Sequence, residues 1–216
     1  MDTAKIEIKT VLLSILSVAL VEAAVRGAVL PLSGEYTFKM ISIGAARCVE
    51  VTFIFLIMSR WGGGLVSIGL DKNTLGAGFI KGLMWSAGFG LLALLGFLIM
   101  RLAGLSLLSL IKTDIPSRPR EVTLYLLVGG LLAPLAEEVF FRGLIYGFLR
   151  RWGIIIACLV SVTLFVLAHS IGGGIPVPQI VGGIIFALAY ELEDNLMVPI
   201  LIHTSGNIAI FGLSLL

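Results

Sequence analysis

The sequence predicts an all-helical, polytopic membrane protein with about seven transmembrane helices. Of its 216 residues, 58% are hydrophobic and only 13% are charged, whereas soluble domains carry about 25% charged residues. Mean hydropathy is +1.10. Apolar runs near the ~20 residues that a helix needs to cross a bilayer recur from Val11 to the C-terminus. We find no separate soluble domain and no internal repeat, so we expect one integral membrane domain with the lipid bilayer as its surroundings.

The N-terminal segment, residues 1–112, is expected to contribute three of these helices. The first two cover about 11–30 and 40–60 and are divided by the polar stretch PLSGEYTFK. The third begins near Leu75 and carries small residues at four-residue spacing, which suit close helix packing. Its apolar run extends to about residue 111, too long for one straight crossing, so the helix either tilts or ends in an interfacial segment.

The second segment, residues 120–216, follows the clearest break in the chain, KTDIPSRPRE, which holds two prolines and several charges. Its first helix is predicted from Glu121 to Arg150–Arg151, longer than a bilayer requires, with a kink at Pro134. Three more spans are expected at about 153–169, 178–191 and 196–216.

Charge and cysteine content narrow the possible partners. The net charge of +2 is small and no basic tract is present, so we expect no nucleic-acid partner. Cys48 and Cys158 lie in apolar surroundings and are expected to act as small hydrophobic residues, with neither a disulfide nor a metal role.

Three ionisable residues interrupt the apolar pattern of the fourth helix: Glu137, Glu138 and Arg142. Ionisable groups inside a span are costly and usually face the bundle interior or a wet cavity. Glu138 and Arg142 are four residues apart and can pair on one face, while Glu137 lies about 100° round the helix. We therefore expect Arg142 to neutralise Glu138 and to leave Glu137 available. A purely structural ion pair is the alternative interpretation of Glu138 and Arg142.

The two histidines of the chain also lie in predicted membrane helices of this second segment. His169 ends the fifth helix, and His203 lies in the seventh, where Asn207 follows four residues later on the same face. Pro199 frees a backbone carbonyl and is expected to bend that helix toward a cavity. With Glu137, these side chains could converge from three helices.

Further charges lie in the first two predicted helices. Glu22 and Arg26 are four residues apart, and Arg47 and Glu50 are three apart. Each pair can form within its own helix, so we interpret both as structural ion pairs or cavity lining.

This set of side chains allows two hydrolytic designs. A glutamate can take a proton from water that a histidine shares, while a second histidine and an asparagine amide stabilise an oxyanion. Alternatively, Glu137, His169 and His203 are the ligand set of a catalytic zinc ion. No serine or cysteine has an evident base partner, so a covalent nucleophile is not expected, and the zinc motif HExxH is absent.

Three short motifs carry a resemblance to a known family. EEVFFR fits the pattern EExxxR, FVLAH fits FxxxH, and HTSGN fits HxxxN. In this order they resemble the CPBP family, which comprises the CAAX proteases and bacteriocin-processing enzymes. It is also called the Abi family and is related to the CAAX prenyl endopeptidase of eukaryotes. The resemblance covers about residues 121–207 and implies a four-helix catalytic core, in which Glu138 and Arg142 orient the reacting groups.

The same resemblance implies the catalytic roles. Glu137 and His169 would activate a water molecule, and His203 with Asn207 would stabilise the oxyanion. Both metal-dependent and metal-free mechanisms are argued for the family. We favour the metal-free one, which needs no cofactor, because His203 and Asn207 share a face as paired donors; zinc remains the alternative.

The sequence therefore predicts an intramembrane endopeptidase that cleaves a membrane-associated protein or peptide. The short chain without appended domains suggests a prokaryotic cell membrane. A non-enzymatic membrane protein is the alternative: a proton-coupled transporter, or a scaffold or immunity protein that binds a partner. In-span charges also mark proton relays, but the lack of an internal repeat weighs against a transporter.

Overall fold

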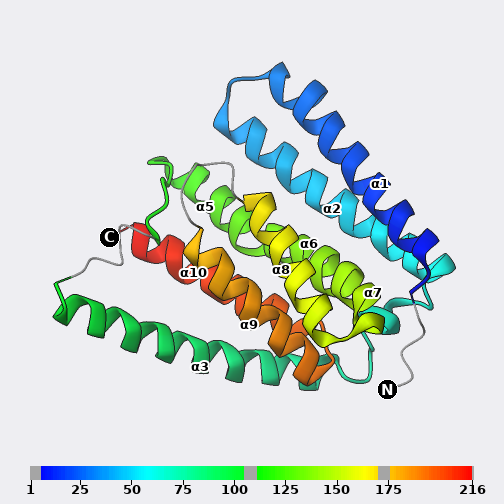
Figure 1. The fold of residues 1–216 in the computed structure, drawn as a ribbon. Coiled ribbons are helices and arrows are strands. Elements are labelled where there is room, and N and C mark those ends of the chain that lie inside the picture. The colour runs from blue at the N-terminus through cyan, green and yellow to red at the C-terminus, as the bar shows by residue number, and fades with distance from the viewer. Residues whose placement is uncertain (1–5, 105–110, 170–175, 216) are drawn as a thin grey trace.

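The computed structural model describes residues 6–104, 111–169 and 176–215, and the regular elements in these ranges are all helical (Figure 1). The helices are α1 (Ile8–Ala24), α2 (Tyr36–Trp61), α3 (Leu75–Leu102), α5 (Pro119–Leu127), α6 (Ala133–Glu138), α7 (Gly147–Leu149), α8 (Ile154–His169), α9 (Val177–Glu193) and α10 (Met197–Ser214). Helices α5, α6 and α7 belong to one continuous helix, Pro119–Trp152. The predicted all-helical fold is confirmed.

Within the described residues, five helical stretches are long and apolar enough to cross a membrane, where the sequence predicted about seven. They are Ile8–Leu32, Tyr36–Trp61, Leu75–Leu102, Pro119–Trp152 and Met197–Ser214. Helices form at the two remaining predicted positions, but α8 has 16 residues and α9 has 17. Both are shorter than the ~20 residues of a full crossing.

The helices form a bundle in which α1 and α2 make a hairpin on one side and α3 lies on the opposite side (Figure 1). Between them lie the helix Pro119–Trp152 together with α8, α9 and α10. Helix α2 packs against α5 and α6, and α3 packs against α10. The interfacial segment predicted after α3 falls largely on residues 105–110, outside the described residues.

The small residues of α3 allow close packing over its first half. A Cβ atom added at Gly78 would lie 2.3 Å from Oδ1 of Asn195, and one added at Gly82 would lie 2.7 Å from Cδ1 of Leu201. At Gly90 such an atom would meet nothing within 4 Å. The predicted packing role therefore holds for Gly78 and Gly82, which let α3 approach the start of α10.

The long helix Pro119–Trp152 is wound as a π-helix over Val128–Leu132 and again over Val139–Tyr146. The first π-helical segment ends directly before α6, in which Pro134 is the second residue, where the sequence predicted a kink. The Ala133 N–H donates to the carbonyl of Val128, five residues back. Because proline has no N–H, the next five-residue bond cannot form, and the carbonyl of residue 129 is left for another donor.

Pro199 has a different place from the one expected. It lies in the first turn of α10, which begins at Met197, where a missing N–H breaks no intrahelical bond. The carbonyl of Asn195, four residues earlier, accepts a hydrogen bond from the N–H of Val198 at 3.2 Å. The structure therefore gives no reason for Pro199 to bend α10.

Ion pairs join the end of α9 and the turn that follows it to two neighbouring helices, the long helix and α3. Arg150 contacts Glu191 at 2.9 Å and Asp194 at 3.1 Å, and Lys81 of α3 contacts Glu193 at 2.6 Å. These contacts hold one end of α9 and α10 in place beside the long helix. Cys48 is exposed, Cys158 is partly buried, and both are free thiols in the structure.

Candidate active site

The predicted ion pair of the long helix is present and completely buried. Nη1 of Arg142 lies 3.0 Å from Oε1 of Glu138, and neither side chain is exposed to solvent. Glu138 ends α6 and Arg142 lies in the π-helical turn that follows, and four residues is close to one turn in either winding. Arg142 also donates from Nη2 to the carbonyl oxygen of Gly183 at 3.0 Å. The guanidinium is therefore held by two different helices.

His203 is bound to the same carboxylate. Its Nδ1 lies 2.8 Å from Oε1 of Glu138. Because an ionised carboxylate only accepts hydrogen bonds, Nδ1 carries the proton and donates it. The other ring nitrogen, Nε2, faces Glu137, whose Oε2 is 3.7 Å away.

His169 has the corresponding arrangement at the end of α8. Its Nδ1 lies 2.8 Å from the carbonyl oxygen of Phe165, one turn earlier. A carbonyl oxygen also only accepts hydrogen bonds, so this Nδ1 is again the donor. Its Nε2 lies 3.5 Å from Oε2 of Glu137. The FxxxH motif thus places a backbone acceptor where it selects the tautomer of the histidine.

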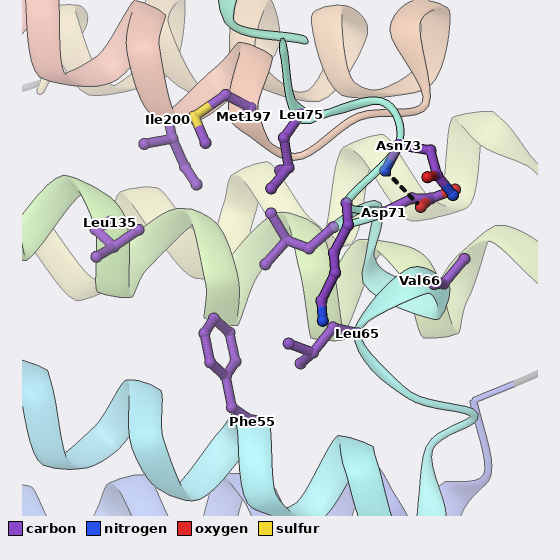
Figure 2. A pocket seen from close by; sticks show the side chains of 11 residues that line it. Phe55, Leu65, Val66, Asp71, Asn73, Leu75, Leu135, Met197 and Ile200 are labelled. Atoms are coloured by element: carbon purple, nitrogen blue, oxygen red, sulfur yellow. Dashed lines mark hydrogen bonds between the residues drawn. The ribbon is translucent and has the colours of Figure 1, made fainter. Parts of the chain in front are cut away.

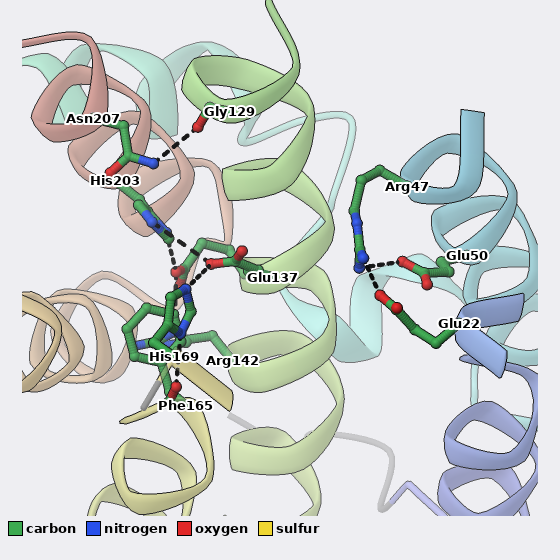
Figure 3. A network of polar contacts seen from close by, with 11 residues as sticks. Glu22, Arg47, Glu50, Gly129, Glu137, Arg142, Phe165, His169, His203 and Asn207 are labelled. Carbon is green, nitrogen blue, oxygen red and sulfur yellow. Dashed lines mark hydrogen bonds and ion pairs between the residues drawn. The ribbon is translucent and has the colours of Figure 1, made fainter. Parts of the chain in front are cut away.

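Glu137 lies where the two histidines meet, and Figure 3 shows its carboxylate facing both rings. With each Nδ1 protonated, a neutral imidazole presents a lone pair at Nε2. Oε2 of Glu137 is buried and accepts no hydrogen bond from the described residues. Three acceptor atoms therefore face one another without a donor, an arrangement that a water molecule or a proton would complete.

Access to this position is uneven. The side chains of His169 and Glu137 are 29% and 21% exposed, whereas that of His203 is 6% exposed. The position is therefore more open beside His169 of α8 than beside His203 of α10.

Asn207 lies one turn after His203, as predicted, but its amide is engaged elsewhere. Its Nδ2 donates to the carbonyl oxygen of Gly129 at 2.9 Å (Figure 3). This is the carbonyl that Pro134 leaves without its helical donor. Asn207 thus donates one amide N–H to a backbone carbonyl of the long helix. The second N–H of its amide remains available as a donor.

Sequence reasoning missed the contribution of α9. Gly183 supplies the carbonyl that binds Arg142, and the ring of Phe186 stacks on His203 with 4.6 Å between ring centroids. A glycine and a phenylalanine in an apolar helix give no sign of a functional contact, so the sequence offered no signal that could have found them.

The alternative of a zinc site finds no support in the described side-chain positions. The described residues contain no group of three or more His, Cys, Asp or Glu side chains with metal-binding geometry. We therefore derive no step through a metal ion. A carboxylate that receives Nδ1–H of a histidine also occurs behind metal-bound histidines, so metal removal belongs among the tests below.

The charges of α1 and α2 form a separate cluster on the other side of the long helix (Figure 3). The two predicted pairs form, with 2.6 Å between Arg26 and Glu22 and 2.7 Å between Arg47 and Glu50. Arg47 also pairs with Glu22, which the sequence did not predict. This contact links α1 to α2, so the cluster acts as a cross-link of the hairpin.

An apolar cavity of about 690 Å³ lies between α2, the 65–75 loop, α6 and the first turn of α10 (Figure 2). Phe55, Leu135 and Ile200 line it from the three helices, and Asp71 and Lys72 belong to its loop side. None of the side chains of the candidate site is part of this lining. The cavity and the candidate site are therefore separate features.

Comparison with known proteins agrees with the geometry of the C-terminal half. Residues 119–209 match the model of the type II CAAX prenyl endopeptidase Rce1-like family. The matched range begins at the first residue of α5 and ends two residues after Asn207, so it contains every candidate site residue.

Two curated proteins are similar to the chain. The membrane-embedded CAAX protease MroQ of Staphylococcus aureus (strain USA300) is 38% identical over 103 residues, which make up 44% of this chain and 41% of that protein. The UPF0177 protein YxdF of Lactococcus lactis subsp. lactis (strain IL1403) is 26% identical over 168 residues, or 74% of this chain and 90% of that protein. The chain thus spans less than half of the length of MroQ.

No solved structure matches the chain with significance. The family match, the similarity to a membrane-embedded bacterial protein and the apolar helices indicate an integral membrane protein. Residues 119–209 are therefore similar to the Rce1-like CAAX prenyl endopeptidase family, the CPBP family of membrane-embedded proteases.

Proposed function

We propose that the protein is an intramembrane endopeptidase that hydrolyses a peptide bond of a membrane-associated protein or peptide. The observation that carries this proposal is the meeting of Oε2 of Glu137 with Nε2 of His169 and Nε2 of His203, at 3.5 and 3.7 Å. Two of these three acceptor atoms can hold one water molecule by its two hydrogens. Similarity to the family supports the reaction type.

The proposed reaction begins with a water molecule held by Glu137 and His169. One hydrogen of the water binds Oε2 of Glu137 and the other binds Nε2 of His169. As the water oxygen bonds to the carbonyl carbon of the substrate, Glu137 accepts a proton and the carbonyl electron pair moves onto oxygen. The same proton is then delivered to the amide nitrogen, the oxyanion pair re-forms the C=O bond as the C–N bond breaks, and a carboxylic acid and an amine are released.

The oxyanion is stabilised from α10. The proton that Glu137 takes from water can pass to Nε2 of His203, which then donates to the oxyanion, while Glu138 stabilises the imidazolium through Nδ1. The second N–H of Asn207 is the other donor. Arg142 holds the carboxylate of Glu138 in place, so we assign both residues an orienting role.

Residues 120–216 form the catalytic core in this proposal, and residues 1–112 form an N-terminal part that encloses it. Packing of α2 on α5 and α6, and of α3 on α10, is consistent with one integral unit. Because one relative is named as a CAAX protease, we expect the substrate to be a protein or peptide. We propose a peptide cleaved near the surface of a bacterial cell membrane.

The test compares wild type with Glu137→Gln and His169→Ala in proteoliposomes, with peptide products identified by mass spectrometry. Candidate substrates are membrane-associated peptides, with and without a lipid group. Loss of a general base lowers kcat by about 10²–10⁴-fold, so both variants should be nearly inactive. Glu22→Gln is the matched control, because Glu22 is an in-span glutamate of the other cluster.

Equal cleavage by wild type, Glu137→Gln and His169→Ala would show that the proposed roles are wrong. Exhaustive metal removal is the second arm of the experiment. Activity that survives chelation supports the metal-free mechanism, whereas activity that is lost and returns with zinc would replace it by a metal-dependent one.

A further inference from the structure

Helix α9 gives no ionisable group to the proposed site, yet it touches two residues that build it. The carbonyl oxygen of Gly183 accepts from Nη2 of Arg142 at 3.0 Å. The ring of Phe186 stacks on the imidazole of His203, with the two planes inclined by 21°. Gly183 and Phe186 are three residues apart and therefore lie on one face of α9.

Close approach of the backbone at Gly183 depends on the missing side chain. A Cβ atom there would lie 3.2 Å from Cγ1 of Val162 and 3.3 Å from Cδ1 of Phe165, both on α8. It would also lie 3.6 Å from Nη2 of Arg142. A larger residue therefore requires Val162, Phe165 or α9 to shift by a few tenths of an ångström beside the hydrogen bond to the guanidinium.

The ring of Phe186 controls a rotation that the hydrogen bonds of His203 leave free. The bond from Nδ1 to Glu138 fixes one ring atom, but rotation about the Cβ–Cγ bond of histidine has broad minima. A ring stacked 4.6 Å away limits this rotation. Phe186 is itself buried and lies 5.2 Å from the guanidinium carbon of Arg142, so it is fixed in turn.

We propose that Gly183 and Phe186 are positioning residues of the site. Gly183 fixes the guanidinium of Arg142, and Phe186 fixes the ring plane of His203 so that Nε2 faces Glu137. The catalytic meaning of this positioning rests on the proposed function, whereas the ring orientation is a property of the resting protein and can be measured without a substrate.

The first experiment reads the tautomer of His203 by ¹⁵N NMR of histidine-labelled protein in lipid nanodiscs. The chain contains two histidines, so two imidazoles give signals, and His169→Gln assigns them. Phe186→Met removes the ring and keeps an apolar side chain of similar bulk. Phe141→Met is the matched control, because Phe141 is similarly buried and, within the described residues, its ring contacts are with Phe140 and Phe165 and not with His203.

We expect wild type, Phe141→Met and the ring-retaining Phe186→Tyr to show His203 as a single tautomer protonated at Nδ1. In Phe186→Met we expect a mixture of the two tautomers. A single Nδ1-protonated tautomer in Phe186→Met would overturn the role of Phe186. Should Phe186→Met fail to fold, Phe186→Leu replaces it under the same criterion.

The second experiment measures cleavage by the same variants. A misplaced reacting group lowers rates by about 10- to 100-fold, so kcat should fall by this factor in Phe186→Met and Gly183→Ala at unchanged KM. Phe141→Met and Gly90→Ala are the controls, since a Cβ at Gly90 meets nothing within 4 Å. Equal losses in variants and controls would refute positioning. Failure of wild type to cleave any peptide would refute the proposed function, while the tautomer measurement would still decide the present proposal.

Discussion

Replacing Arg142 by methionine should destabilise the protein strongly, because it leaves a buried carboxylate without its counter-charge. Arg142 and Glu138 are both fully buried and lie 3.0 Å apart. Removing one partner of a buried ion pair typically costs about 3–5 kcal/mol. The lost hydrogen bond to Gly183 adds to this change, since bonds of charged groups contribute about 1.5–3 kcal/mol.

One contact should reduce the loss. Oε1 of Glu138 also binds Nδ1 of His203 at 2.8 Å, and a protonated imidazole can replace part of the missing positive charge. We therefore expect a loss near the lower end of the range, about 3 kcal/mol. Substituting both members of a buried pair is often close to neutral, so Glu138→Gln combined with Arg142→Met should regain at least half of the loss.

The measurement is reversible unfolding in mixed micelles, followed by circular dichroism as the fraction of denaturing detergent rises. Arg26→Met is the matched control: Arg26 also pairs with a glutamate four residues earlier, but its side chain is 65% exposed. Pairs of this kind contribute about 0–1 kcal/mol. If Arg142→Met unfolds within about 1 kcal/mol of wild type and keeps full activity, the argument for this ion pair is wrong.

Two further predictions concern helix packing and the amide of Asn207. Gly82→Leu should destabilise the protein by about 1–3 kcal/mol in the same unfolding assay, because the new side chain meets Leu201. Gly90→Leu is the control and should have little effect. Equal effects of the two substitutions would contradict the described packing of α3. Asn207→Ala should lose about 1 kcal/mol, and less when Pro134→Ala restores an N–H to the long helix. If the amide of Asn207 binds the oxyanion, cleavage should be lost in Asn207→Ala and also in Asn207→Ala combined with Pro134→Ala. Recovery of cleavage in the double variant would show instead that the amide serves to cap the carbonyl of Gly129.

Much of this arrangement was predictable from spacing, because helical periodicity alone decides which residues share a face. The pairing of Glu138 with Arg142, and the availability of Glu137, followed from separations of four and one residues. The chain has two histidines, and both face Glu137. The tautomer of His203 could not be predicted, because it depends on an acceptor that Glu138 supplies across a helix interface.

Contacts made by the backbone and by apolar side chains were not predictable. The bond from Asn207 to Gly129 exists because a π-helical turn meets a proline, and only the fold places α10 beside that turn. The contact of Arg47 with Glu22 likewise depends on how α1 and α2 pair. Helices form at all seven predicted positions, and within the described residues five of them are long enough to cross a membrane, while α8 and α9 are short, as their predicted ranges 153–169 and 178–191 indicated.

Two interpretations of Glu138 and Arg142 were open from the sequence, a structural ion pair or a functional role. In the structure the carboxylate that forms the ion pair also contacts His203, so the two interpretations are compatible. One oxygen, Oε1 of Glu138, contacts both Nη1 of Arg142 and Nδ1 of His203. The same oxygen that pairs with the guanidinium therefore also serves as the acceptor for the histidine. Protonation of Glu138 would turn the acceptor into a donor, and Nε2 of His203 would no longer be the nitrogen left free to face Glu137. Glu138→Gln retains an acceptor oxygen at this position, so it should preserve the tautomer of His203 better than Glu138→Leu. The same ¹⁵N measurement would show this difference, and equal tautomer populations in the two variants would contradict it.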